Sequence, residues 1–146
     1  MAKNSIHCRL VTPSESLLDA EVVYASIPAW DGLFGVQANH APLLARLGLG
    51  ELRLDFPEGE DGSRSYLVDE GFVQIVDNTL TILAEKAIPA ERLTVQEAEA
   101  ALREAEARTL PDDAPDRAAS LQKISRERRR AELALRIAKS HRGKGI

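Results

Sequence analysis

The chain has one cysteine, few aromatic residues and no long apolar run, and each shortage excludes a class of protein. Because Cys8 has no second cysteine to pair with, no intrachain disulfide can form, and we expect a reducing compartment. No stretch reaches the roughly 18 apolar residues that cross a bilayer as a helix. No early segment has the basic end and apolar core of a signal peptide, so none is expected. A role at a membrane would therefore need another component to hold the chain there.

Signatures of catalysis and of metal binding are also missing from the sequence. It contains no P-loop, no pair of cysteines at metal-ligand spacing and no cluster of metal ligands. A small enzyme that uses Asp31 and His40 is one alternative, but neither Ser nor Cys lies beside His40 as a nucleophile. The sequence therefore predicts no catalytic residue, no bound metal and no cofactor.

Alternating apolar and polar residues predict that the first part of the chain is a β-sandwich. Ile6, Cys8 and Leu10 alternate with polar residues, and the same period of two covers 18–24 and 52–56. Residues 57–62 are predicted as a polar hairpin tip, and Asp77-Asn78 as a tight turn between two strands. Strands at this spacing, with turn signals between them, predict an antiparallel β-sandwich over residues 1–91.

A glycine-containing stretch in the middle of the chain is the most distinctive local pattern. Gly32 and Gly35 allow positive φ or the close approach of a neighbour, and Pro42 favours an extended backbone before it. The stretch predicts a turn, a short strand, a rigid corner and a new strand from Leu43. Trp30, the only tryptophan, is interpreted as a core or interface anchor rather than a platform for a ligand.

The period of the apolar residues changes at Thr94, which indicates helices. Thr94 and Glu97 form a capping box at the start of a first helix, which is expected to stop near Leu110-Pro111. A second helix is expected from about Asp116 to Ser140, so residues 92–146 should form an α-helical hairpin. Its apolar seam is rich in alanine and interrupted at Arg128, which predicts weak docking.

Charge is divided unevenly along the chain. Residues 1–92 carry 7 Lys and Arg against 14 Asp and Glu, a net charge of −7, whereas residues 117–146 carry 10 against 2, a net charge of +8. An acidic part and a basic tail indicate different partners. The basic helix could be a solvated face, a nucleic-acid site or a site for an acidic protein surface. Nucleic acid is disfavoured because no aromatic residue between the arginines offers a stacking platform.

Three segments carry a resemblance to a known family. They are Val11-Thr12-Pro13, then the loop Gly-x-x-Gly-Val at 32–36 followed by Asn-His-Ala-Pro-Leu-Leu at 39–44, and last 71–75 leading into 78–84. Together, and in this order, they resemble the epsilon subunit of bacterial F-type ATP synthases. The resemblance covers essentially the whole chain.

The resemblance implies a non-catalytic central-stalk subunit that couples rotation between the c ring and the gamma subunit. It implies a peripheral place at the cytoplasmic face of the bacterial membrane, within the complex. It also implies that the sandwich contacts gamma and the c ring, and the candidates for that contact are Asp31, Gly32, Leu33, Phe34, Gly35, Asn39 and His40. The hairpin is a possible inhibitor of ATP hydrolysis that reaches the alpha and beta subunits, and its candidates are Arg126, Arg128, Arg129, Arg130 and Arg136.

Some members of that family bind ATP through an Ile/Leu-Asp-x-x-Arg-Ala motif at the start of the first helix. The matching positions are 93–98, where Thr94 replaces the aspartate and Glu97 replaces the arginine. A carboxylate in place of a cation repels phosphate, so ATP binding is doubtful. The competing interpretation of the whole chain is a free-standing regulatory module that binds nucleic acid through its basic C-terminal helix.

Overall fold

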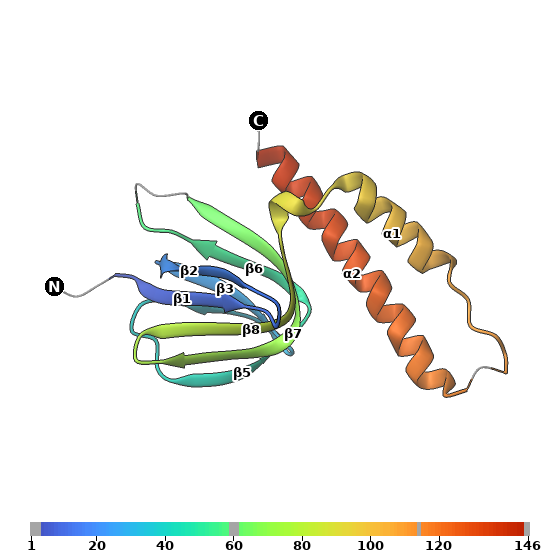
Figure 1. Cartoon of the computed structure of the whole chain (residues 1–146), viewed down its shortest axis with the longest axis horizontal. Coiled ribbons are helices and arrows are strands. Elements are labelled where there is room, and N and C mark those ends of the chain that lie inside the picture. The colour runs from blue at the N-terminus through green and yellow to red at the C-terminus, as the bar shows by residue number, and fades with distance from the viewer. Residues whose placement is uncertain (1–3, 59–61, 114, 145–146) are drawn as a thin grey trace. The chain divides into compact units, whose positions relative to one another are not determined.

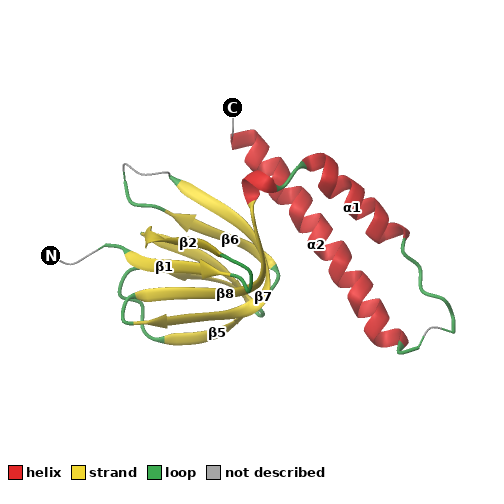
Figure 2. Cartoon of the chain, viewed as in Figure 1, coloured by secondary structure: helices red, strands yellow, loops and turns green. Residues whose placement is uncertain are grey.

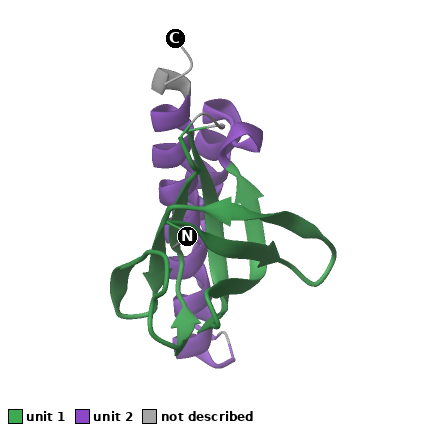
Figure 3. Cartoon of the chain, turned by 90° about the vertical axis from the view of Figure 1, so that its left-hand side faces the viewer, with its two compact units in different colours: residues 1–89 green, residues 90–146 purple. Residues whose placement is uncertain are grey.

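The chain folds into two compact units, Met1–Pro89 and Ala90–Ile146 (Figure 3). The computed structural model describes residues 4–58, 62–113 and 115–144. Strands make up the first unit and helices the second (Figure 2). The predicted fold class, a β-sandwich followed by two helices, is confirmed. Of the predicted hairpin tip at 57–62, residues 59–61 lie outside the described residues.

Eight strands form a single sheet that folds over into two layers (Figure 1). In chain order they are β1 (Ile6–Val11), β2 (Ser16–Val22), β3 (Tyr24–Ala29), β4 (Gly32–Val36), β5 (Leu43–Leu47), β6 (Gly50–Asp55), β7 (Ser63–Val76) and β8 (Thr79–Pro89). The order along the sheet is β2-β1-β8-β7-β5-β3-β4, and β6 pairs with β3 and β7. The inward side chains of both layers meet in one apolar core.

The long strand β7 belongs to both layers. Its first half, Ser63–Val68, pairs with β6, and its second half, from Gly71 to Ile75, pairs with β5. β8 runs beside β7 along nearly its whole length. The turn between them has Asp77 at φ 49° and Asn78 at φ 55°, so the predicted tight hairpin is confirmed.

Two details of the predicted sandwich are wrong. The alternating run from Leu18 to Tyr24 is two strands rather than one, because the backbone leaves β2 at Val23. The Val23 amide donates to the carbonyl of Asp55 at 2.8 Å, which turns the chain from β1 to new neighbours. The sheet is also not wholly antiparallel, since β1 lies parallel to β8, with His7 opposite Thr79. β1 and β8 therefore both start at the same end of the sandwich.

Three helical segments form the second unit. They are a 3-10 turn, η1 (Ala90–Arg92), and the helices α1 (Val95–Ala107) and α2 (Arg117–Lys144). The Glu97 amide donates to the Thr94 hydroxyl at 3.2 Å, as the capping box predicts. The Ala119 amide donates to Asp116 Oδ1 at 3.3 Å and begins α2 in the same way. α2 continues four residues beyond the predicted end at Ser140.

The helices α1 and α2 meet along alanines, and Arg128 lies off this seam. Ala98 and Ala105 of α1 and Ala131 and Ala138 of α2 are buried, as an alanine-rich seam requires. Arg128 does not interrupt this seam: it is exposed and pairs with Glu132 at 3.7 Å on its own helix. Glu127 instead bridges the hairpin, because it accepts from the Arg108 guanidinium at 2.6 Å. Arg108 therefore pairs across the hairpin rather than with Glu104 on its own helix.

Gly71 offers a direct test of how the two layers are joined. Gly71 and Gly32 have φ angles of +133° and +138°, which residues other than glycine rarely adopt. A Cβ at Gly71 would also collide with the carbonyl oxygen of Leu83, whereas a Cβ at Gly32 would meet nothing within 4 Å. Gly71→Ala should therefore lower the free energy of unfolding by about 1–3 kcal/mol more than Gly32→Ala. Urea denaturation of the two variants measures the difference. Equal losses of unfolding free energy in the two variants would show that β7 and β8 can move apart at Gly71 at no cost in stability.

Candidate interaction surfaces

The turn between β3 and β4 presents large apolar side chains to solvent. Trp30 is 72% exposed and Leu33 70% exposed, while Asp31 and Gly35 are also exposed. Trp30 is therefore not a core anchor, which leaves the interface interpretation. Phe34 differs from its neighbours because it is partly buried and packs against the core. Of the five predicted contact residues here, Asp31 lies in the turn and the other four lie in β4; all except Phe34 are exposed and so accessible to a partner.

The Asn39–His40 corner serves the sandwich itself. Asn39 has φ 63°, and its amide donates to Asn78 Oδ1 at 2.7 Å. The Asn78 side-chain amide also donates to the carbonyl of Ser5 at 3.0 Å, so one side chain joins three segments. The His40 Nδ1 lies 2.7 Å from the carbonyl oxygen of Ala41. The backbone amide of Asn39 and the ring of His40 therefore have partners within the unit.

The turn and the corner lie at opposite ends of β5. The Trp30 amide donates to the carbonyl of Arg46 at 3.1 Å, which places the turn at the end of β5. The corner precedes Leu43, at the beginning of β5. Because β-strands rise about 3.3 Å per residue, the two ends of β5 are roughly 13 Å apart. The seven residues that the resemblance groups together thus extend from the turn, along β4, to the corner.

A second exposed apolar surface lies on the outward face of β5, β7 and β8, and sequence reasoning did not select it. Leu44 is 72%, Phe72 55% and Leu83 49% exposed. Their neighbours along the strands, such as Val73 and Ile82, point into the core. The signal was available in the sequence, because these three residues occupy the polar phase of their strands. We call Leu44, Phe72 and Leu83 the outer apolar row.

The five candidate arginines of α2 do not share one face. Arg128, Arg129 and Arg136 are exposed, whereas Arg126 and Arg130 are partly buried. At 100° per residue the five spread over about 200° of the helix circumference. A flat partner surface could contact only some of them, and the exposed three are the more accessible.

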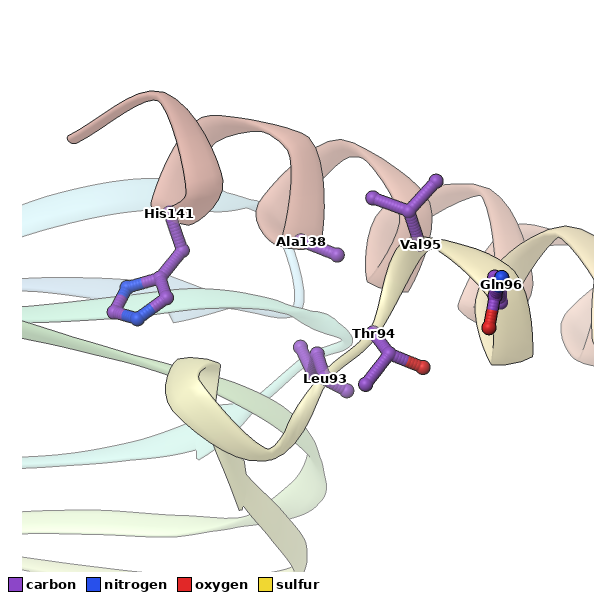
Figure 4. A pocket seen from close by; sticks show the side chains of 6 residues that line it. All are labelled: Leu93, Thr94, Val95, Gln96, Ala138 and His141. Atoms are coloured by element: carbon purple, nitrogen blue, oxygen red, sulfur yellow. The ribbon is translucent and has the colours of Figure 1, made fainter. Parts of the chain in front are cut away.

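The start of α1 lies beside an open pocket of about 410 Å³ within the helical unit (Figure 4). Its lining consists of Leu93, Thr94, Val95, Gln96, Ala138 and His141. The Thr94 hydroxyl already accepts from the Glu97 amide. Among the side chains that the structure describes, no lysine or arginine lines the pocket. The described lining thus offers apolar contacts from Leu93, Val95 and Ala138 and polar contacts from Gln96 and His141, without a lysine or arginine for a phosphate.

Groups for catalysis or metal binding do not come together in the described part of the chain. No cluster of three or more His, Cys, Asp or Glu side chains is found among residues 4–58, 62–113 and 115–144. Burial, helped by the negative charge of Asp19, raises the pKa of the Cys8 thiol to about 12, so the thiolate that acts as a nucleophile is scarce at neutral pH. Over the same described residues, no helix is both long and apolar enough to cross a membrane.

Solved structures share the fold of this chain. A chain of the Euglena gracilis mitochondrial ATP synthase, in a structure of OSCP, F1 and the c-ring, aligns with a TM-score of 0.68 and 24% identity over 100% of this chain and 84% of its own length. A chain of the Tetrahymena thermophila mitochondrial ATP synthase, in a structure of the central stalk and c-ring, aligns with a TM-score of 0.60 and 17% identity over 94% of this chain and 99% of its own.

Sequence comparison identifies the family. The family described as "ATP synthase, Delta/Epsilon chain, beta-sandwich domain" matches residues 5–90. The ATP synthase epsilon chain of Rhodopirellula baltica is 40% identical over 114 residues, 78% of this chain and 85% of that protein. The epsilon chain of Rubrobacter xylanophilus is 32% identical over 141 residues, 94% of each chain. This chain therefore belongs to the ATP synthase epsilon chain family.

Proposed function

We propose that this chain is a non-catalytic central-stalk subunit of a proton-translocating F-type ATP synthase, where it couples rotation between the c ring and gamma. The observation that carries the proposal is the similarity to the Rubrobacter xylanophilus epsilon chain, which runs through 94% of both proteins and so includes the helices as well as the sandwich. Catalysis would belong to the alpha and beta subunits. The complex would hold the chain at the cytoplasmic face of the bacterial membrane.

The architecture of the first unit suits the transmission of torque. β7 and β8 pair through both layers, so a force applied to one layer passes to the other through backbone hydrogen bonds. The core between the layers is closely packed, and packed interiors resist compression. A rigid block of this kind would move with its partners rather than yield between them.

The sandwich, rather than the hairpin, should hold gamma permanently. A truncation after Ala90 keeps the whole compact β unit and should stay folded and bind gamma at one-to-one stoichiometry. Co-purification with gamma, with circular dichroism as the test of folding, measures this. A truncated protein that is folded but no longer binds gamma would contradict the proposal.

We propose in addition that the helical hairpin is a movable brake on ATP hydrolysis. Among the described side chains of α1 and α2, four of the six buried ones are alanines, which bury little apolar area, and only Leu133 and Ile137 are larger, so the helices should change their neighbours for a small free energy. α2 carries the +8 segment, and acidic surfaces of the alpha and beta subunits would attract it. Single exposed ion pairs contribute only about 0.2–1 kcal/mol, so several must act together.

Removal of the hairpin should therefore release ATP hydrolysis by the assembled complex. Truncation after Arg92, or alanine at Arg126, Arg128, Arg129, Arg130 and Arg136, should raise the rate without detaching the sandwich. The increase should shrink as salt rises, since salt already weakens the intact brake within a screening length of about 8–10 Å. ATPase assays at several salt concentrations test this. Equal rates for the truncated and intact subunits at low salt would show that the hairpin is no brake.

We infer further that the isolated protein binds ATP weakly or not at all. Thr94 is engaged as the helix cap, and the exposed Glu97 carboxylate stands where the family motif has a cation. Calorimetry should give a dissociation constant of about 1 mM or weaker. The double variant Thr94→Asp with Glu97→Arg restores the motif and should bind more tightly than the natural chain. Micromolar affinity of the natural chain would overturn the inference.

A further inference from the structure

We propose that Asp31, in the exposed turn between β3 and β4, is a site of spontaneous modification at which the aspartate is converted to isoaspartate. The reaction needs a flexible residue after the aspartate, a carboxyl group that is free to bend back on the main chain, and access to water. The turn provides all three. The chemistry belongs to the chain itself and does not depend on the proposed function.

The conversion has two steps, and water is the only other reactant. In the first step the backbone nitrogen of Gly32 attacks Cγ of Asp31, a C–N bond forms, and the carboxyl hydroxyl leaves as water with the amide proton. The product is a five-membered succinimide ring. In the second step water opens the ring at one of its two carbonyls. One opening restores aspartate, and the other leaves isoaspartate, whose main chain runs through the former side-chain carboxyl carbon. The net change in mass is zero.

Gly32 is the residue that allows the ring to close. A side chain after the aspartate would crowd the attacking nitrogen, and glycine has none. Gly32 is exposed, and a Cβ built on it would meet nothing within 4 Å, so no neighbouring group crowds the turn here. Among the described aspartates, Asp31 alone is followed by glycine. The other Asp-Gly pair of the sequence begins at Asp61, which lies outside the described residues.

The carboxyl group of Asp31 is free to bend back on the main chain. It is exposed, and within the described residues it makes no hydrogen bond and no ion pair. Asp19 is also exposed, but it lies within β2 opposite Arg9, and its Oδ1 is 2.5 Å from Nε2 of His7. Alanine rather than glycine follows it. Asp19 is therefore a control for exposure without the other two conditions.

The turn between β7 and β8 shows how the fold can prevent the same chemistry. The side-chain oxygen of Asn78 accepts from the Asn39 amide at 2.7 Å, and its side-chain nitrogen donates to the carbonyl of Ser5 at 3.0 Å. A side chain held at both atoms can reach its own main chain only by breaking these bonds. The structure therefore selects Asp31 over Asn78.

Isoaspartate at residue 31 would change the connection between β3 and β4. Only two residues join these strands, since Ala29 is paired with Gly32 and Pro28 with Leu33. Isoaspartate adds one carbon to the main chain within this connection, and the geometry of a hairpin turn sets the register of its strands. The exposed Leu33 would therefore shift relative to Pro28.

Mass spectrometry of the full-length chain after prolonged incubation in buffer tests the proposal. Trypsin releases residues 10–46 as one peptide, because no lysine or arginine lies between Leu10 and Arg46, so Asp31 and Asp19 are measured together. Fragmentation by electron transfer breaks the Cα–Cβ bond that isoaspartate has in its main chain, and so locates it. Isoaspartate should form at least about tenfold faster at residue 31 than at residue 19, which needs only about 1.4 kcal/mol of activation free energy.

Three variants test the route through the ring. Asp31→Glu keeps the charge but would need a six-membered ring, so the modification at residue 31 should disappear. Gly32→Ala crowds the attacking nitrogen and should slow the reaction. Asp31→Asn should form the same ring with loss of ammonia, and its products are then visible as a change in mass because a carboxyl group replaces the amide.

A short peptide with the sequence of residues 28–35 gives the rate without the fold. The folded chain should react no more than about tenfold slower than this peptide. A larger difference would show that the hairpin closes the turn to the reaction, and the proposal would be wrong. Equal rates at residues 31 and 19 of the natural chain would also overturn it. No partner takes part in these measurements, so their failure leaves the proposed function untouched.

Discussion

The close approach of β7 to β8 at Gly71 is the constraint on which the sandwich depends. At this point β7 exchanges β6 for β5 as its second neighbour, so the strand bends while its pairing with β8 continues. The bend brings the backbone against the carbonyl of Leu83, where no side chain could fit. Because one strand pair runs through both layers, the layers are joined by backbone hydrogen bonds as well as by the core. The positions of the outward side chains of β7 and β8 follow from this register.

The helical unit is held by a different balance. Alanines at the seam let α1 and α2 approach closely but bury little apolar area. The Arg108–Glu127 pair adds a contact across the hairpin, although exposed ion pairs are weak. Long helices with high intrinsic helix propensity can remain helical even where they bury little apolar area. A unit of this kind keeps its secondary structure while it changes neighbours, which is what a movable element needs.

Local patterns in the sequence were reliable where one residue decides one contact. The alternation of Ile6, Cys8 and Leu10, the Asp77-Asn78 turn and the Thr94 cap all appear as predicted, because each is set by nearby residues. The predictions that were wrong concern contacts between residues that are far apart in the sequence. The break at Val23 is fixed by a hydrogen bond to Asp55, and the parallel pairing of β1 with β8 by the topology of the sheet. Arg128 was misplaced because a straight helix with 3.6 residues per turn rotates by about 20° per heptad, so residues at a strict seven-residue spacing do not stay on one seam.

The surfaces were harder to predict than the fold for the same reason. The Asn39–His40 corner is distinctive in the sequence because the fold requires a positive φ at Asn39. Phe72 and Leu83 look ordinary in the sequence, since an apolar residue in a strand is expected to be buried. Only the register shows that they face outward and lie side by side with Arg46.

A distinctive residue can be required by the fold or by a partner. The two cases are separated by whether the residue already has its hydrogen bonds and its buried contacts within the folded chain. The Asn39 backbone amide and the His40 ring have their partners within the chain, whereas the exposed apolar side chains leave surface for another protein to cover.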